Sequence, residues 1–86
     1  MEVSNKIKIQ IIQTEIVNKV SELIRQKRLK KGYSYKLLGE ISGVDRTHIA
    51  RIEQGLRPNY AFTMLARLFS ALKIEYSEID DLLEQD

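Results

Sequence analysis

Three residues near the middle of the chain, Arg46, Thr47 and Arg51, carry side chains that can recognise the edges of nucleic-acid bases. An arginine guanidinium donates two parallel hydrogen bonds to O6 and N7 of guanine, and threonine offers both a hydroxyl and a methyl group. Together with Ala50 they fall on one side of a helix expected over residues 46–54, with apolar residues on the other side. Because alanine is small, such a helix could sit deep in a groove. We expect all four residues to contact DNA bases.

Other polar residues around this segment are suited to holding the phosphate backbone. Most protein–DNA hydrogen bonds go to phosphate, so phosphate contact is an equal alternative for Arg51, which lies farther from the helix start. His48 is the single histidine, and no nucleophile motif surrounds it, so we expect no catalytic role. The expected phosphate contacts are Tyr35, Lys36, His48, Gln54, Arg57 and Asn59.

Apolar residues at helical spacing, with sparse glycine and one proline, predict an all-α domain of five helices. Ser34 and Asp45 are typical N-cap residues, and Gly32, Gly43 and Gly55 are typical of helix ends. The expected helices span residues 14–31, 35–42, 46–54 and 60–72, and a fifth begins after Ser77 with Asp80 completing a capping box. Leu37, Leu38, Ile41, Phe62, Leu65, Leu68, Phe69 and Leu72 are expected to face inward.

Residues 1–13 form an N-terminal extension to the domain expected over residues 14–86. The segment KIKIQI alternates with period two, which favours a strand over residues 6–12. A lone strand needs a partner, and the simplest one is its copy in a second subunit. The alternative is that these residues extend the first helix, because Ile9, Ile12 and Ile16 also fall at helical spacing.

Composition excludes several classes of protein. The 86 residues suffice for one domain and contain no cysteine, so disulfides, thiolate metal sites and a structural zinc site are not expected. No nucleophile–base pair, metal cluster or glycine-rich phosphate loop indicates an enzyme or a cofactor. No apolar run is long enough to span a membrane and no secretion signal is evident, so we expect a cytoplasmic protein.

Charge is distributed unevenly along the chain, although the net charge is only +2. The segment from Arg25 to Arg57 has nine basic and three acidic residues, whereas the segment from Ile74 to Asp86 has six acidic and no basic ones. Such a molecule presents one face to a polyanion and repels it with the other.

Two charged residues fall on otherwise apolar helix faces. Arg28 lies one turn beyond Ile24, and Glu53 lies one turn beyond Ile49. An unpaired charge is costly inside a protein, so we expect Arg28 and Glu53 to form a partly buried ion pair. The alternative is that both extend independently to solvent.

The ordered residues Arg28, Gly32, Leu38, Gly39, Gly43, Val44, Ile49, Glu53, Gly55, Ala71 and Leu72 resemble the phage-repressor (Cro/repressor, XRE-type) helix-turn-helix family. The resemblance implies a five-helix bundle of the lambda-repressor-like type, which binds operator DNA, usually as a dimer. Two positions depart from the family. Gly39 stands where alanine is most frequent, and Tyr35 stands where glutamine is common, so the glutamine's amide contacts are not carried over.

The leading functional hypothesis is a sequence-specific transcriptional regulator that binds double-stranded DNA as a homodimer. The alternatives are an antitoxin that also binds a toxin protein and an adaptor that binds protein without DNA. The last helix could instead simply cover its own bundle. The residues expected at the dimer interface are Tyr76, Ile79, Leu82 and Leu83, together with Ile7, Ile9 and Ile11 of the N-terminal extension.

Overall fold

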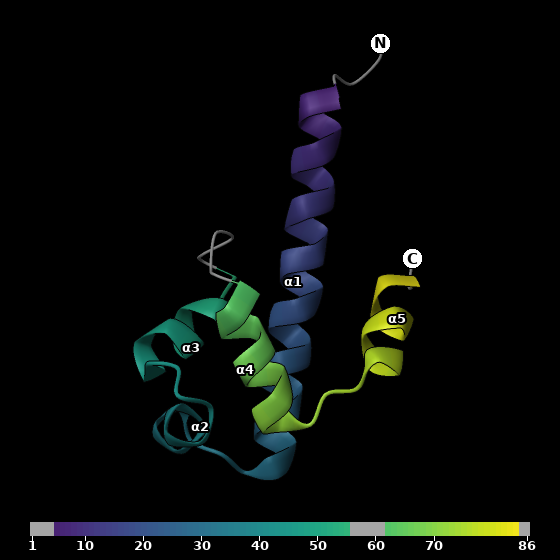
Figure 1. Ribbon diagram of the computed structural model, residues 1–86. Helices are drawn as coiled ribbons and strands as arrows, with labels where there is room; N and C mark the ends of the chain where they lie inside the picture. Colours follow the sequence, from purple (N-terminus) through teal and green to yellow (C-terminus); the bar gives the residue numbers. More distant parts are fainter. Residues whose placement is uncertain (1–4, 56–61, 85–86) are drawn as a thin grey trace.

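The structure is a computed structural model that describes residues 5–55 and 62–84 of the chain. Within the first helix, side chains are described at Lys8 and from Thr14 onward. Five helices make up these residues: α1 (Asn5–Lys31), α2 (Tyr35–Ser42), α3 (Arg46–Glu53), α4 (Phe62–Leu72) and α5 (Tyr76–Glu84) (Figure 1). The expected five-helix, all-α fold is confirmed.

Helix α1 is the central support of the bundle, because α3, α4 and α5 all pack against it. Helix α2 packs on α3 and α4 at the end of the molecule farthest from the N-terminus (Figure 1). One apolar core joins the first four helices, and its fully buried members are Ile24, Leu38, Ile49, Ile52, Leu68 and Leu72.

The strand expected over residues 6–12 is wrong, because these residues form the first part of α1. No glycine or proline interrupts the chain before Gly32, and a helix satisfies its backbone hydrogen bonds without a partner chain. The alternative reading, based on the helical spacing of Ile9, Ile12 and Ile16, described the segment correctly. The N-terminal part of α1 extends beyond the other helices (Figure 1).

The ends of α1 and α4 have the same hydrogen-bond pattern but different residues at the critical position. After α1, the N–H groups of Gly32 and Tyr33 bond to the carbonyls of Leu29 and Arg28, and Gly32 has φ +71°. After α4, the N–H groups of the next two residues bond in the same way, with Lys73 at φ 56°. Glycine is the usual residue at this left-handed position, so Lys73 carries backbone strain that Gly32 does not.

The N-cap expected at Ser77 is also wrong. Helix α5 begins at Tyr76, and the carboxylate of Glu78 accepts a hydrogen bond of 2.9 Å from the backbone N–H of Glu75. Glu78 also pairs with Lys27 of α1. The hydrogen bond from Lys27, followed by that from Glu75, lowers the pKa of Glu78. This pair ties α5 to α1, and the bond from the Glu75 N–H to Glu78 accompanies a helix start two residues before the predicted position.

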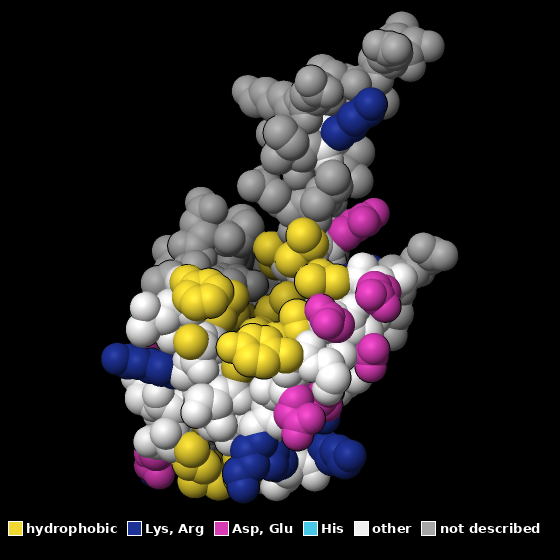
Figure 2. Space-filling view, turned by 45° about the vertical axis from the view of Figure 1, so that its right-hand side comes forward, with side chains coloured by type: hydrophobic (Ala, Val, Ile, Leu, Met, Phe, Trp, Pro, Cys, Tyr) yellow, Lys and Arg dark blue, Asp and Glu magenta, His cyan; other side chains and the backbone are white. Residues whose placement is uncertain are grey.

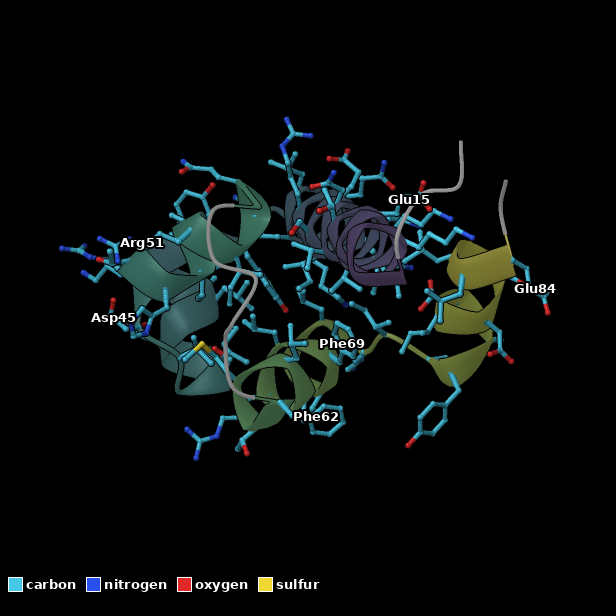
Figure 3. All side chains as sticks on the ribbon, turned by 90° about the horizontal axis from the view of Figure 1, so that it is seen from above. Glu15, Asp45, Arg51, Phe62, Phe69 and Glu84 are labelled. Carbon is cyan, nitrogen blue, oxygen red and sulfur yellow. The ribbon has the colours of Figure 1, made fainter. Side chains whose placement is uncertain are left out.

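Three residues expected to face inward are exposed. In the short helix α2 the fully buried side chain is Leu38, which leaves Leu37 and Ile41 at the edge of the buried face. Phe62, the first residue of α4, is 83% exposed. Phe69, two turns further on, is partly buried against the core, so the apolar side of α4 continues beyond the bundle at Phe62 (Figure 3).

Candidate nucleic-acid interface

Local signals fix the arrangement of α2 and α3. The side chain of Ser34 accepts a hydrogen bond from the N–H of Leu37 at the start of α2. Gly43 ends this helix with φ +76°, and its N–H bonds to the carbonyl of Gly39. Asp45 then caps α3 by accepting a 2.8 Å bond from the N–H of Thr47. The expected bounds of α2 are confirmed, and those of α3 agree to within one residue.

Gly39 allows the turn to close tightly. A Cβ atom at this position would lie 2.9 Å from the carbonyl oxygen of Val44. Val44 is itself buried and fills the space beneath the turn. The small residue at position 39 therefore sets the distance between α2 and the start of α3.

Helix α3 has one buried side and one side open to solvent. Ile49 and Ile52 are buried in the core, and Arg46, Thr47 and Arg51 are exposed. Ala50 lies between the two sides and is half-buried. Figure 3 shows Asp45 and Arg51 at the outer edge of the molecule, on the side away from α5. The residues expected to contact bases thus form one accessible edge of α3, which we call the reading edge (Arg46, Thr47, Ala50 and Arg51).

A buried ionic network holds the other end of α3. Arg28 donates hydrogen bonds to Glu53 from Nε to Oε2 at 2.7 Å and from Nη2 to Oε1 at 3.1 Å. Their side chains are 11% and 2% exposed, so the expected partly buried pair is present. The hydrogen bond to Glu53 raises the pKa of Arg28. The pair links α1 to the last residue of α3.

Tyr35 belongs to this network. Its ring lies 4.2 Å from the guanidinium carbon of Arg28, and its hydroxyl donates to Oε1 of Glu53 at 3.3 Å. A phosphate oxygen can only accept hydrogen bonds, and the single hydroxyl hydrogen of Tyr35 is already donated to Glu53. The expected phosphate contact through this hydroxyl is therefore withdrawn. Sequence periodicity gave no signal for this role, because Tyr35 is the first residue of its helix.

The remaining expected phosphate contacts differ in their surroundings. Lys36 and Gln54 are exposed at the ends of α2 and α3. His48 is half-buried and shares a shallow hollow with Asp45 and Arg67, an exposed arginine of α4 that the sequence analysis did not single out. Arg57 and Asn59 lie outside the described residues.

The residues expected at a dimer interface are partly accessible. Tyr76 and Leu83 are exposed, whereas Ile79 and Leu82 are half-buried. Ile7, Ile9 and Ile11 lie in α1, but their side chains are outside the described set. Figure 2 shows apolar side chains gathered on the face where α1, α4 and α5 meet, with acidic side chains along one side.

In residues 5–55 and 62–84, no cluster of three histidine, cysteine or acidic residues could hold a metal ion. No helix in the same ranges is sufficiently long and apolar to cross a membrane.

The helix-turn-helix geometry is matched by known proteins. A family model described as Helix-turn-helix matches residues 24–79. The HTH-type transcriptional regulator SlrR of Bacillus subtilis (strain 168) is 32% identical over 62 residues, which cover 72% of this chain and 41% of SlrR. The crystal structure of the restriction-modification controller protein C.AhdI from Aeromonas hydrophila superposes with a TM-score of 0.65 and 33% identity, covering 73% of this chain and 94% of that one.

These similarities agree with the fold. The chain belongs to the phage-repressor-like (XRE-type) helix-turn-helix family. It spans less than half the length of SlrR, whereas its match to C.AhdI includes nearly all of that protein.

Proposed function

We propose that the protein is a sequence-specific DNA-binding transcriptional regulator that acts as a homodimer on a two-fold operator. The observation that carries this proposal is the reading edge of α3, which is open to solvent while the opposite side of the helix is buried. Its two arginines suit bidentate recognition of guanine, and its threonine suits a base edge or a thymine methyl group. Relatives named as a transcriptional regulator and a controller protein support the same class.

Phosphate contacts would fix the register of this helix in the groove. The first two N–H groups of α2 have no acceptor within the helix, and the positive end of its dipole favours an anion. Lys36 and Gln54 add exposed polar side chains on either side of the reading edge. Arg57 and Asn59 complete the proposed set from the segment after α3.

The proposed dimer forms through the apolar face where α1, α4 and α5 meet. Helices α4 and α5 each pack on α1. Phe62 and Tyr76 are 83% and 89% exposed, which is costly for large apolar side chains without a partner. A second copy is the occupant we propose, because one recognition helix reads few base pairs and specific binding usually needs two, about 34 Å apart.

Selection of bound sequences from a random DNA pool tests the proposed function. We expect a two-fold symmetric site whose half-sites are separated by about one helical turn. If the dimer neutralises about eight phosphates, log K should fall against log[salt] with a slope near −7. A pool without a consensus would contradict sequence-specific binding, and a slope near zero would contradict the proposed electrostatics.

Sedimentation at micromolar concentration tests the dimer independently. Leu83→Asp should shift the protein to monomer, because it places a charge in the proposed interface. Ile41→Asp is the matched control, since Ile41 is similarly exposed but lies on α2, which is not part of the proposed interface. A wild-type protein that sediments only as monomer would contradict the two-fold proposal.

A further inference from the structure

The start of α2 is held by contacts from two other helices. Arg28 of α1 donates a hydrogen bond of 2.9 Å from Nη1 to the carbonyl oxygen of Tyr33, just before the Ser34 cap. The same guanidinium lies over the ring of Tyr35, just after the cap. The hydroxyl of Tyr35 reaches Glu53, the last residue of α3. The cap is therefore fixed from both sides to α1 and, through Tyr35, to the recognition helix.

We infer that Tyr35 is a positioning residue that holds the phosphate-binding start of α2 in register with the reading edge of α3. This inference rests on the proposed function. The side chain of Tyr35 does not contact the DNA, because its ring stacks on Arg28 and its hydroxyl hydrogen is donated to Glu53. It acts by holding in place the exposed ammonium of Lys36 and the first two N–H groups of α2, which have no preceding carbonyl in the helix to accept their hydrogen bonds.

The binding free energies of two contacts to DNA add fully only when the contacting groups are held in the right relative position. Arg46 and Arg51 lie on a helix of eight residues that ends at Glu53. Glu53 is almost fully buried and accepts bonds from both Arg28 and Tyr35. A shift at the start of α2 would leave base reading intact but would weaken the phosphate contact at each half-site. The side chain of Tyr35 thus couples the two kinds of contact without making either.

Salt dependence of binding distinguishes this role from a general effect on stability. Tyr35→Leu keeps an apolar side chain but removes the aromatic face and the hydroxyl, whereas Tyr35→Phe keeps the face that stacks on Arg28. Losing the phosphate contact of the Lys36 ammonium, one per subunit and two per dimer, should make the slope of log K against log[salt] less steep by about 1.8. We expect this change for Tyr35→Leu. Tyr35→Phe should keep a slope close to wild type, because its ring still stacks on Arg28 and Arg28 remains bonded to Glu53.

The control is Leu37→Ala, which truncates an exposed residue of the same helix outside the network. Its slope should equal that of wild type. All variants are compared at a temperature where circular dichroism shows them to be fully folded. If Tyr35→Leu is not folded there, Tyr35→Met replaces it with the same expected change in slope. Amide NMR adds a second readout: the Lys36 N–H signal should shift on DNA binding in wild type and Tyr35→Phe, and far less in the leucine or methionine variant.

The outcomes separate the inference from the proposed function. A wild-type slope near zero would contradict the proposed electrostatics of DNA binding itself. A steep wild-type slope that is unchanged in a folded Tyr35→Leu or Tyr35→Met variant would overturn the positioning role alone. A reduced slope in Leu37→Ala would also overturn it, because any truncation on α2 would then have the same effect.

Discussion

Removing Glu53 is predicted to destabilise the fold severely. In Glu53→Ala the guanidinium of Arg28, only 11% exposed, loses both hydrogen bonds to the carboxylate and keeps one bond to the carbonyl of Tyr33. The hydroxyl of Tyr35 loses its acceptor in the same substitution. Breaking a buried ion pair on one side costs about 3–5 kcal/mol, because a charge remains buried without its partner. This is a large fraction of the stability of a small domain.

Urea unfolding followed by circular dichroism measures this cost. With an m-value of about 1–3 kcal/mol per molar urea, a loss of about 4 kcal/mol lowers the midpoint by more than about 1 M. Glu22→Ala is the matched control, because Glu22 pairs with Arg25 at 3.5 Å while both side chains are about half exposed. Exposed pairs of this kind contribute about 0–1 kcal/mol, so its midpoint should change little.

The double variant Arg28→Met/Glu53→Leu separates pairing from burial. Replacing both charges by apolar residues of similar size leaves neither charge unpaired, so it should cost far less than Glu53→Ala alone. Equal midpoints for wild type and Glu53→Ala would refute the reasoning, since they would mean that the charge on Arg28 reaches solvent without its partner.

Three further predictions concern the helix ends and the turn. Lys73→Gly should stabilise the protein by about 1 kcal/mol, because glycine adopts the left-handed backbone conformation without strain. Gly32→Lys, at the equivalent position after α1 where a Cβ has open space, should destabilise it by a similar amount. Thermal unfolding midpoints that move in the same direction for both variants would contradict this. Gly39→Ala should lower the urea midpoint. The added Cβ would lie 2.9 Å from the Val44 carbonyl oxygen, and this clash outweighs a gain in helix propensity of about 1 kcal/mol. A raised midpoint would show that the turn adjusts freely. The pKa of Asp45 is lowered, chiefly by the hydrogen bond from the N–H of Thr47. The capping carboxylate therefore stabilises the fold fully at pH values above its ordinary pKa of 3.8. This stabilisation is lost as the pH falls through the lower pKa of the folded state. Asp45→Asn still caps but does not titrate, so wild type should lose stability relative to it as the pH falls from about 5 to 3, and parallel curves would contradict this.

The part of the fold that follows from local signals could be predicted from sequence. Ser34, Gly43 and Asp45 act on their immediate neighbours, so the bounds of α2 and α3 were accurate. The pairing of Arg28 with Glu53 followed from helical periodicity, because each charge lies one turn from a buried isoleucine.

Features that depend on the surroundings could not be predicted in this way. The isoleucines near the N-terminus fit both the period-two spacing of a strand and the spacing of a helix. Helix α1 runs through this segment without a break, which decides in favour of the helix. The contact of α5 with α1 includes Lys27, which is distant in sequence but pairs with Glu78. The exposure of Phe62 depends on where the bundle ends along α4, and the contacts of Tyr35 depend on residues of two other helices.

The central claim is that the reading edge of α3 contacts base edges, and Arg46→Ala tests it most directly. Affinities of wild type and variant should be compared on the selected operator, on operators with single base-pair changes and on random DNA at one salt concentration. We expect a loss of about 1–3 kcal/mol on the operator, relaxed preference at one base pair of each half-site and a smaller loss on random DNA. Equal losses on operator and random DNA would contradict the claim, because Arg46 would then be a phosphate contact.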